Sequence, residues 1–345
     1  MIEMRRQCHL SRTLFRKTEQ SHWATPANFS PLHHIDELAC GGKDGGMALE
    51  ERIERLSDGA WRICAPAKLN LGLRVFDLRA DGFHPLETWM VPISWHDTLT
   101  YRPGGPLRLL ITGRSAGVPA EIEKNLVGRA AVRLAREAGR DPWGVVELHK
   151  VLPPGGGLGG GSSDAANALV LLDAAWGLGL GTEKLLAVAA ELGSDVPFFV
   201  PAVPSLCRGR GEVMSPLRPM HGLYAVLMLP ERGMPTGPVF GAFDAGHRHP
   251  GAGATDWERL ARLPSAELNQ ELVNDLEPAA FSIGGWLKEL GEIASKVAGQ
   301  KVHMTGSGST LFTLCDSAEA ARGLAEKCSE ALGQCVSIPV RISRQ

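Results

Sequence analysis

The sequence lacks the long apolar segments of a membrane protein and the cysteine pattern of a disulfide-rich one. Its 345 residues contain no apolar run that reaches the roughly 18 residues of a membrane-spanning helix, and the N-terminus shows no apolar core of a signal peptide. The seven cysteines are odd in number and scattered, without a Cys-x-x-Cys pair, which argues against a disulfide framework and a zinc site. We therefore expect a protein of the reducing cytoplasm, with no membrane partner.

The sequence also lacks an excess of either charge. Its 36 lysines and arginines nearly balance 38 aspartates and glutamates, which gives a formal net charge of −2. No general electrostatic field favours nucleic acid, which is not expected as a partner. An anionic small molecule would have to be bound by local devices, such as backbone amides, helix N-termini and single lysines.

The length suits two domains rather than one. Residues 1–57 include a glycine-rich stretch at 41–46 and little apolar periodicity, so we predict a disordered N-terminal extension. A globular pattern begins near Trp61 and continues to the end of the chain. We predict two domains, at residues 58–217 and 218–345, without an internal repeat.

Periodicity and turn residues predict a mixture of strands and helices. Strands are expected at residues 61–65, 69–75, 91–101, 107–112, 145–151, 224–229, 301–305, 310–315 and 336–342. Helices are expected at residues 125–138, 162–176, 183–192, 256–263, 271–298 and 318–332. Hairpin-like strands combined with packed helices indicate an α+β fold in two lobes.

The strongest single signal is a loop with six glycines among the seven residues 155–161. Without Cβ atoms, a ligand can approach the backbone closely and positive φ angles are accessible. The loop leads into a predicted helix, whose first N–H groups and positive dipole end form an anion site. Ser162 and Ser163 could cap that helix or offer hydroxyls to a phosphate or a hydrated Mg²⁺. A flexible linker is the alternative, which the strand before and the helix after disfavour.

Two common phosphate loops fit this segment poorly. A P-loop requires a lysine before its Ser or Thr, and none precedes Ser162. Gly155, Gly157 and Gly160 match Gly-x-Gly-x-x-Gly only because any glycine run does. The dinucleotide-binding loop should also follow its strand at once, whereas Pro153-Pro154 intervenes here.

The loop instead resembles the central motif of the GHMP kinase superfamily, Pro-x-x-x-Gly-Leu-Gly followed by small residues and Ser-Ser. One branch of the superfamily has the longer form Gly-Gly-Gly-Leu-Gly-Gly-Gly-Ser-Ser that is found here. Residues 65–71 resemble the opening Pro-Ala-Lys-x-Asn strand, in which Lys68 and Asn70 alternate along one face. Without the neighbouring motifs, Lys68 could equally be an exposed strand lysine.

Three further segments follow in the order of this superfamily. Residues 192–199 resemble Leu-Gly-x-Asp-Val-Pro, in which Asp195 stands at the catalytic aspartate; by itself, Asp195 could be a turn or helix-capping residue. Residues 304–310 resemble the third, glycine-rich motif, for which an ordinary hairpin turn is the alternative. Residues 274–278 resemble a structural signature of the branch.

The turn at residues 79–86 resembles the branch motif Arg-x-Asp-Gly-Tyr-His-x-Leu, whose aromatic and histidine contact a cytosine. Phe83 replaces the tyrosine, so stacking is retained and the phenol hydrogen bond is lost. Thr236 and Phe240 match the substrate-contacting threonine and a second stacking aromatic. A hairpin turn with one packed aromatic is the alternative for this segment.

Two positions depart from the pattern. Cys207-Arg208 replaces the usual Arg-Gly, and Asp164 stands where an asparagine is familiar. A carboxylate at the start of a phosphate-binding helix repels ATP, so we expect Asp164 to turn away or to help hold Mg²⁺. Lys150 is a further residue that could contact a phosphate of ATP. We also expect that replacing Gly159 with valine abolishes ATP binding while the protein still folds.

The resemblance covers about residues 60–342 and implies a two-lobed GHMP kinase fold with its active site in the cleft between the lobes. The domain at 58–217 would bind ATP, the phosphoryl donor, together with Mg²⁺ and without a protein metal site. The implied ATP-binding residues are Pro153, Pro154, Gly155, Gly156, Gly157, Leu158, Gly159, Gly160, Gly161, Ser162 and Ser163. The implied catalytic residues are Lys68 and Asp195, and the implied substrate-binding residues are Asn70, Phe83, His84, Thr236 and Phe240.

The branch acts in isoprenoid precursor synthesis on a small-molecule acceptor that carries a cytidine diphosphate. Another GHMP kinase, of the mevalonate or homoserine pathway, is an alternative that the turn at 81–84 argues against. A non-catalytic nucleotide-binding protein of the same fold is a second alternative, which the presence of Lys68 and Asp195 disfavours.

Overall fold

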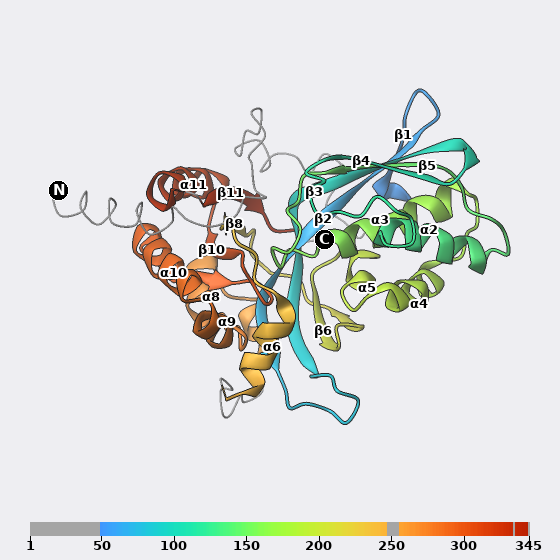
Figure 1. Cartoon of the computed structure of the whole chain (residues 1–345). Coiled ribbons are helices and arrows are strands. Elements are labelled where there is room, and N and C mark those ends of the chain that lie inside the picture. Colours follow the sequence, from blue (N-terminus) through green and yellow to red (C-terminus); the bar gives the residue numbers. More distant parts are fainter. Residues whose placement is uncertain (1–48, 247–254, 334, 344–345) are drawn as a thin grey trace.

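The computed structural model describes residues 49–246, 255–333 and 335–343, which contain two sheets and the helices packed on them (Figure 1). In the first sheet the strand order is β1-β2-β3-β5-β4, with β6 paired to β3 and β7 paired to β6. Its strands are β1 (Ile53–Arg55), β2 (Trp61–Val75), β3 (Leu86–Pro106), β4 (Arg108–Gly113), β5 (Trp143–Lys150), β6 (Ser205–Gly209) and β7 (Val213–Pro216). Only β4 and β5 run parallel among the pairs of this sheet that the structure describes.

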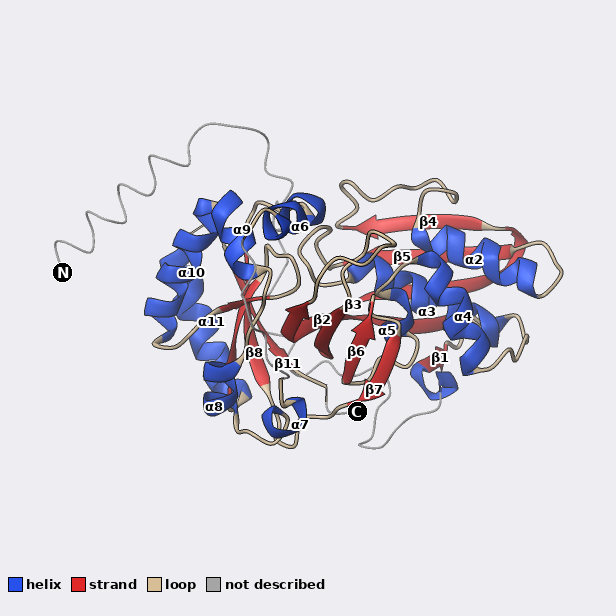
Figure 2. Ribbon diagram, turned by 90° about the horizontal axis from the view of Figure 1, so that it is seen from below, coloured by secondary structure: helices blue, strands red, loops and turns tan. Residues whose placement is uncertain are grey.

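One face of the first sheet is covered by helices (Figure 2). These are α2 (Leu126–Glu137), α3 (Gly160–Ala175), α4 (Thr182–Leu192) and the short α5 (Val196–Phe199). The side chain of Asn125 caps α2 by accepting a hydrogen bond from the amide of Val127 at 2.9 Å. Residues 163–172 of α3 are all buried, so α3 is the central helix of this lobe.

The second lobe is an antiparallel sheet in the order β11-β8-β10-β9, packed against helices. Its strands are β8 (Tyr224–Leu229), β9 (His303–Met304), β10 (Leu311–Cys315) and β11 (Val336–Arg341). Its helices are α6 (Thr236–Asp244), α7 (Trp257–Leu260), α8 (Ser265–Glu271), α9 (Glu277–Ile283), α10 (Gly285–Ala298) and α11 (Ala318–Leu332). None of the helices in the described residues is long and apolar enough to cross a membrane.

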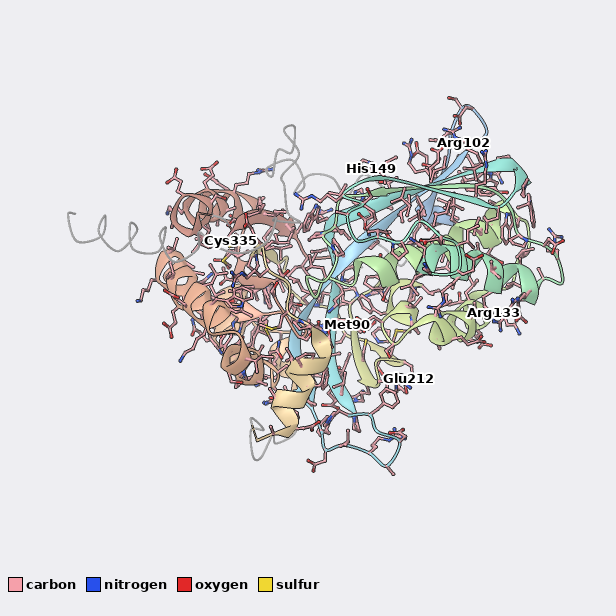
Figure 3. All side chains as sticks on the ribbon, in the orientation of Figure 1. Met90, Arg102, Arg133, His149, Glu212 and Cys335 are labelled. Atoms are coloured by element: carbon pink, nitrogen blue, oxygen red, sulfur yellow. The ribbon has the colours of Figure 1, made fainter. Side chains whose placement is uncertain are left out.

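The long strands β2 and β3 connect the two lobes. Leu73 of β2 bridges to Asn274, and Ile93 of β3 bridges to Ile342 in the second lobe. One apolar core contains residues of β2 and β3 together with residues of β8, β10 and β11. Met90 of β3, paired with Asn70, lies at this junction near the middle of the molecule (Figure 3). The lobes therefore share a continuous core, and the junction can hold side chains from both.

Several elements differ from the sequence-based expectation. The two strands expected between residues 61 and 75 form one strand, β2, with irregular pairing around Ala67 and Leu71. The helix expected at 271–298 is divided into α9 and α10, because Pro278 starts a new helix and Gly284 ends it. The elements β6, β7 and α6 were not expected. Cys64 is disulfide-bonded, contrary to our expectation, whereas Cys207, Cys315, Cys328 and Cys335 are free.

The first lobe begins earlier than residue 58. A short helix, η2 (Leu49–Arg52), and strand β1 precede β2, and β1 pairs with β2 from Ile53↔Ile63 to Arg55↔Trp61. Leu49 and Ile53 pack on the core of the first lobe. The extension predicted for residues 1–57 is therefore wrong for residues 49–57, while residues 1–48 lie outside the described part of the chain.

This boundary predicts different results for two truncations. A protein that starts at Met47 should keep the melting temperature of the full chain, because it retains η2 and β1. A protein that starts at Trp61 should melt about 5–15 °C lower, since it loses two apolar side chains and a strand pairing. Calorimetry of the three proteins checks this. A large loss in the Met47 protein would contradict the assignment of residues 1–46 as dispensable.

Candidate active site

Two glycine-rich loops from distant parts of the chain touch each other between the lobes. The first is residues 155–161; the amide of Lys68 donates to the carbonyl of Leu158 at 3.0 Å and holds this loop on β2. The second is residues 305–308. Gly157 has a φ of +75°, and a Cβ there would lie 2.8 Å from the carbonyl oxygen of Thr305. Glycine is therefore required at 157 by loop-to-loop packing.

The N-terminus of α3 carries no side-chain cap. Its N-cap is Gly159, in the left-handed conformation, and no side chain accepts a capping hydrogen bond there. The expected capping by Ser162 or Ser163 is therefore wrong; Ser163 is buried, with Oγ 3.3 Å from Nδ2 of Asn167. The first N–H groups of α3 remain available, next to the exposed Gly161 and the half-exposed Ser162. This end of α3 has the donors and the dipole of an anion site.

Lys68 and Asn70 of β2 are buried together. The ammonium of Lys68 donates to Oδ1 of Asn70, and Nδ2 of Asn70 donates to the hydroxyl of Thr88 at 2.7 Å. The amide of Asn70 donates to the hydroxyl of Thr305, at 2.9 Å, in the second glycine loop. The exposed-lysine interpretation of Lys68 is therefore wrong, since only 4% of its surface is accessible. A buried ammonium implies a charged partner or a function.

Asp195 immediately precedes α5, close enough to Lys68 for their charges to interact. Its carboxylate accepts no capping hydrogen bond from α5, which speaks against a merely capping role. Burial lowers the pKa of Lys68, and the negative charge of Asp195 opposes that shift. Cys207 of β6 interacts with both charges, and burial raises the pKa of its thiol to about 12. From the sequence, Cys207 was noted only as a departure from the family motif. No residue close to it in the sequence predicts that it lies near Lys68 and Asp195.

Lys150 is held by two buried carboxylates. Its ammonium donates to Asp97 and, at 2.6 Å, to Oδ2 of Asp164. Burial alone would lower the pKa of Lys150, but the two carboxylates raise it, and burial together with Asp97 raises that of Asp164 well above its usual range. Lys150 is thus engaged inside the protein rather than facing a phosphate. Asp164 is likewise buried, and its carboxylate pairs with Lys150.

The branch signature at 274–278 supports the second glycine loop. Nδ2 of Asn274 donates to the carbonyls of Met304 and Gly306, at 2.7 and 2.8 Å, and Oε2 of Glu277 accepts from the amide of Met304 at 2.9 Å. At the other side of the loop, the hydroxyls of Ser307 and Thr236 are 2.9 Å apart. Thr236 therefore joins α6 to the loop.

The turn at 79–86 and helix α6 bring two of the expected substrate residues, His84 and Phe240, together. The ring of His84 stacks on Phe240, with centroids 5.7 Å apart, and its Nε2 lies 3.1 Å from Oδ1 of Asp244. Phe83 is 45% exposed, and the guanidinium of Arg210 lies 3.6 Å above the ring centroid. Aromatic surface is thus presented by both lobes at this place.

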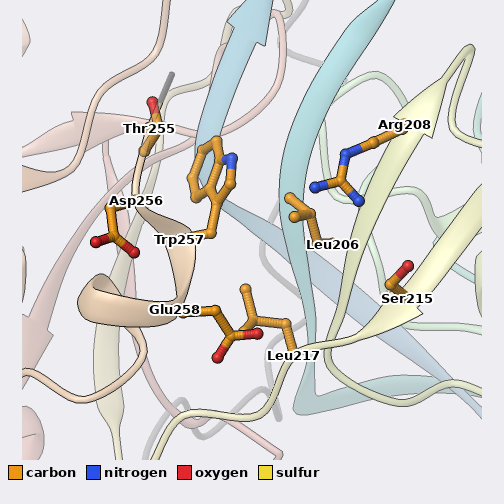
Figure 4. Close-up of a pocket in the computed structure, with 8 residues that line it drawn as sticks. All are labelled: Leu206, Arg208, Ser215, Leu217, Thr255, Asp256, Trp257 and Glu258. Atoms are coloured by element: carbon orange, nitrogen blue, oxygen red, sulfur yellow. The ribbon is translucent and has the colours of Figure 1, made fainter. Parts of the chain in front are cut away.

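A separate pocket of about 240 Å³ opens beside β6, β7 and α7 (Figure 4). It is lined by Leu206, Arg208, Ser215, Leu217, Thr255, Asp256, Trp257 and Glu258. None of the expected catalytic, nucleotide-binding or substrate-binding residues is among them. This pocket is therefore not part of the candidate active site at the two glycine loops.

Comparisons with known domains and structures agree with this geometry. Residues 125–201 match the GHMP kinases N terminal domain, and residues 251–334 match the GHMP kinases C terminal domain. A crystal structure of 4-(cytidine 5'-diphospho)-2C-methyl-D-erythritol kinase has a TM-score of 0.71 at 33% identity, covering 82% of this chain and 99% of the other. A homoserine kinase from Cytophaga hutchinsonii shares the fold, with a TM-score of 0.60 at 17% identity, covering 84% and 96%.

Two relatives define the family more narrowly. A 4-diphosphocytidyl-2-C-methyl-D-erythritol kinase of Nocardia farcinica is 40% identical over 76% of this chain and 87% of its own length. One of Salinispora tropica is 42% identical over 80% of this chain and 90% of its own. The chain therefore belongs to the GHMP kinases and, among them, to the family of 4-diphosphocytidyl-2-C-methyl-D-erythritol kinases, which are small-molecule phosphotransferases.

Proposed function

We propose that this protein transfers the γ-phosphoryl group of ATP to the 2-hydroxyl of 4-diphosphocytidyl-2-C-methyl-D-erythritol, a step of the non-mevalonate route to isoprenoid precursors. The observation that carries the proposal is the meeting of the buried Lys68, the nearby Asp195 and the two glycine loops between the lobes. A second lysine near the loop, Lys150, is neutralised by carboxylates, so Lys68 is the cation that the geometry offers to the reaction.

The nucleotide would lie over residues 155–163, with its phosphates at the N-terminus of α3. Phosphoryl transfer depends chiefly on alignment and charge neutralisation, which uncapped amides supply without rearrangement. Mg²⁺, when bound, would supply neutralisation of the phosphate charge. No group of three or more His, Cys, Asp or Glu side chains gathers as a metal site in the described residues, so the ion would be held mainly by the phosphates. The half-exposed hydroxyl of Ser162 fits as a supplementary ligand.

The acceptor hydroxyl would lie beside Asp195. Its carboxylate can accept the hydroxyl proton as the bond to phosphorus forms, and the ammonium of Lys68 offsets developing negative charge. Asn70 holds the ammonium in place through its Oδ1. Because the transition state is loose, orientation of the hydroxyl by Asp195 contributes as well as proton removal.

An acceptor panel tests the proposal. The purified protein is given ATP, Mg²⁺ and, separately, the cytidine-containing acceptor, mevalonate or homoserine, and ADP release is followed by a coupled assay. We expect turnover only with the cytidine-containing acceptor, and a phosphate monoester in the product by ³¹P NMR. Turnover of mevalonate or homoserine instead would make it another GHMP kinase, and no turnover at all would favour a non-catalytic nucleotide-binding protein.

The cytosine of the acceptor would contact Phe83, His84 and Phe240, far from the reacting hydroxyl. Stacking on His84 and Phe240 joins a residue of the first lobe to one of the second. Holding a remote part of the acceptor aligns its reacting end. Thr236 would contact the acceptor from the start of α6, where it meets the second glycine loop.

Removal of either phenylalanine should weaken the acceptor alone. Base–aromatic stacking is typically worth ~1–3 kcal/mol, so Phe83→Ala or Phe240→Ala should raise the acceptor KM about 5- to 150-fold and leave the ATP KM nearly unchanged. Leu78→Ala is a matched control, because Leu78 is an exposed apolar residue near the same turn. If ATP binding weakened instead, the two ligands would have been assigned to the wrong places.

A further inference from the structure

Arg52 lies outside every motif of the superfamily, in the short helix η2 that precedes β1 (the blue turn before β1 in Figure 1). Its side chain is partly buried, and burial lowers the pKa of its guanidinium to about 10, which leaves the group charged at neutral pH. Nη1 donates to the carbonyl oxygen of Val200, and Nη2 donates to Oδ1 of Asn167. The guanidinium thus joins two residues that are 148 and 115 positions away in the chain.

Each of these contacts leads to one half of the candidate active site. Val200 is the C-cap residue of α5, the single helical turn that Asp195 begins. Asn167 is buried on α3, and its Nδ2 donates to the carbonyl of Ser163 in the first turn of α3 at 2.8 Å. Nη1 of Arg52 therefore fixes the helical turn that Asp195 begins, and Nη2 fixes α3, whose N-terminus forms the phosphate site.

A second contact between α5 and the start of α3 is also closely packed. Phe199 of α5 lies against Gly159, with a ring carbon 2.8 Å from the place of a Cβ. This contact sets how near α5 approaches the loop, and Arg52 fixes the next turn of α3. A planar guanidinium with two donors in fixed directions holds both acceptors at one separation, which a lysine cannot do.

We propose that Arg52 is a positioning residue that fixes Asp195 relative to the phosphate site at the start of α3. The inference rests on the proposed function, because it takes Asp195 and the α3 N-terminus as the two halves of one reaction. Misplacement of reacting groups by about 1 Å can reduce the rate ~10²-fold without loss of binding. The effect of Arg52 should therefore appear in kcat more than in either KM.

The test compares Arg52→Met and Arg52→Lys with the matched control Arg55→Met. Arg55 is an exposed arginine next to η2, on β1, with its guanidinium 3.9 Å above the ring of Trp61, so its loss perturbs the same segment without touching α3 or α5. We expect Arg52→Met to lower kcat about 10- to 100-fold with both KM values within about threefold. Arg52→Lys should lie between it and the unsubstituted protein, and Arg55→Met should stay within about twofold.

A second readout needs no acceptor. Hydrogen–deuterium exchange should rise at the hydrogen-bonded amides of Val196, Val200 and Ser163 in Arg52→Met, and not in Arg55→Met. The proposal would be overturned if kcat of Arg52→Met, measured well below its melting temperature, were unchanged. It would also be overturned if Arg52→Met and Arg55→Met lost equal factors in kcat. In either case Arg52 would only stabilise the fold. Should Arg52→Met not fold, Arg52→Lys decides by the same two measurements. If the unsubstituted protein did not use the cytidine-containing acceptor, the proposed function would fail while the exchange comparison still tested Arg52.

Discussion

Replacing Asp195 with asparagine is expected to lower kcat about 10²- to 10⁴-fold while the KM values for ATP and acceptor stay within a few-fold. The amide keeps the size of the side chain and loses the charge that takes the proton and orients the hydroxyl. Steady-state kinetics of the folded variant measures this. Glu183→Gln, at an exposed carboxylate in the first turn of α4, is the control and should change nothing.

Lys68→Met should also lower kcat strongly if Lys68 and Asp195 act as a unit, as proposed. In that case the double variant loses much less than the product of the two single losses. Independent, multiplicative losses would show that the two groups serve separate steps. Near-normal kcat in folded Asp195→Asn would refute the assignment and direct the search for the catalytic group elsewhere between the lobes.

The burial of Lys68 adds a pH dependence to the same prediction. Burial lowers the pKa of Lys68, with the charge of Asp195 opposing. In the proposed mechanism the ammonium form is the active one. It is present below that pKa, so kcat/KM should fall as the pH rises through it, below the ordinary lysine value of about 10.4. The alkaline limb should be absent in Lys68→Met.

The second large effect is expected at Gly161. This residue is exposed in the first turn of α3, and a Cβ there would meet only a methyl carbon of Leu126 at 3.7 Å, an ordinary contact. A side chain on a helix leans toward its N-terminus, so Gly161→Val places methyl groups over the amides that would bind phosphate. Loss of one charge-assisted hydrogen bond (~1.5–3 kcal/mol) should weaken ATP about 10- to 150-fold. Calorimetric titration with a non-hydrolysable ATP analogue measures this.

The control for Gly161→Val is Gly323→Val, at another helical glycine, on α11, where a Cβ meets nothing within 4 Å. That variant should bind the analogue normally. Normal affinity in Gly161→Val, with a normal melting temperature, would contradict a phosphate site at this end of α3. A valine at Gly159, the variant favoured by the sequence, does not isolate phosphate binding, because its Cβ would collide with Phe199 and approach Lys68 to 3.2 Å.

Much of the fold could be predicted where structure depends on near neighbours. The strand at 224–229 and the helix at 318–332 were predicted to the residue, as β8 and α11. The helix has its own signals, a capping Ser317 before it and Gly333 after it. The start of α3 could not be predicted in the same way, because the glycines before it have no side chain that could mark a helix cap. Helix α3 begins at Gly160, two residues before Ser162.

The same distinction between local and long-range determinants holds for the candidate site. Sequence alone determined which chemical groups are present: two glycine loops, a strand lysine, an aspartate before a short helix, and the aromatic turn. It could not determine which of two lysines is available, because Lys68 and Lys150 each lie on a strand near the first glycine loop. The tertiary structure decides this, since strand pairing brings Asp97, 53 residues away, and α3 brings Asp164 onto the ammonium of Lys150.

The contacts of Arg52, Cys207 and Asn274 were likewise decided only by the fold. Arg52 reaches Val200 across 148 positions, and Asn274 reaches the second glycine loop across about 30. The local rules that govern helix periods, caps and turns act over about four residues, and so they leave a readable pattern. Contacts across a sheet or between lobes depend on register and packing of the whole chain, and a single sequence carries no local mark of them.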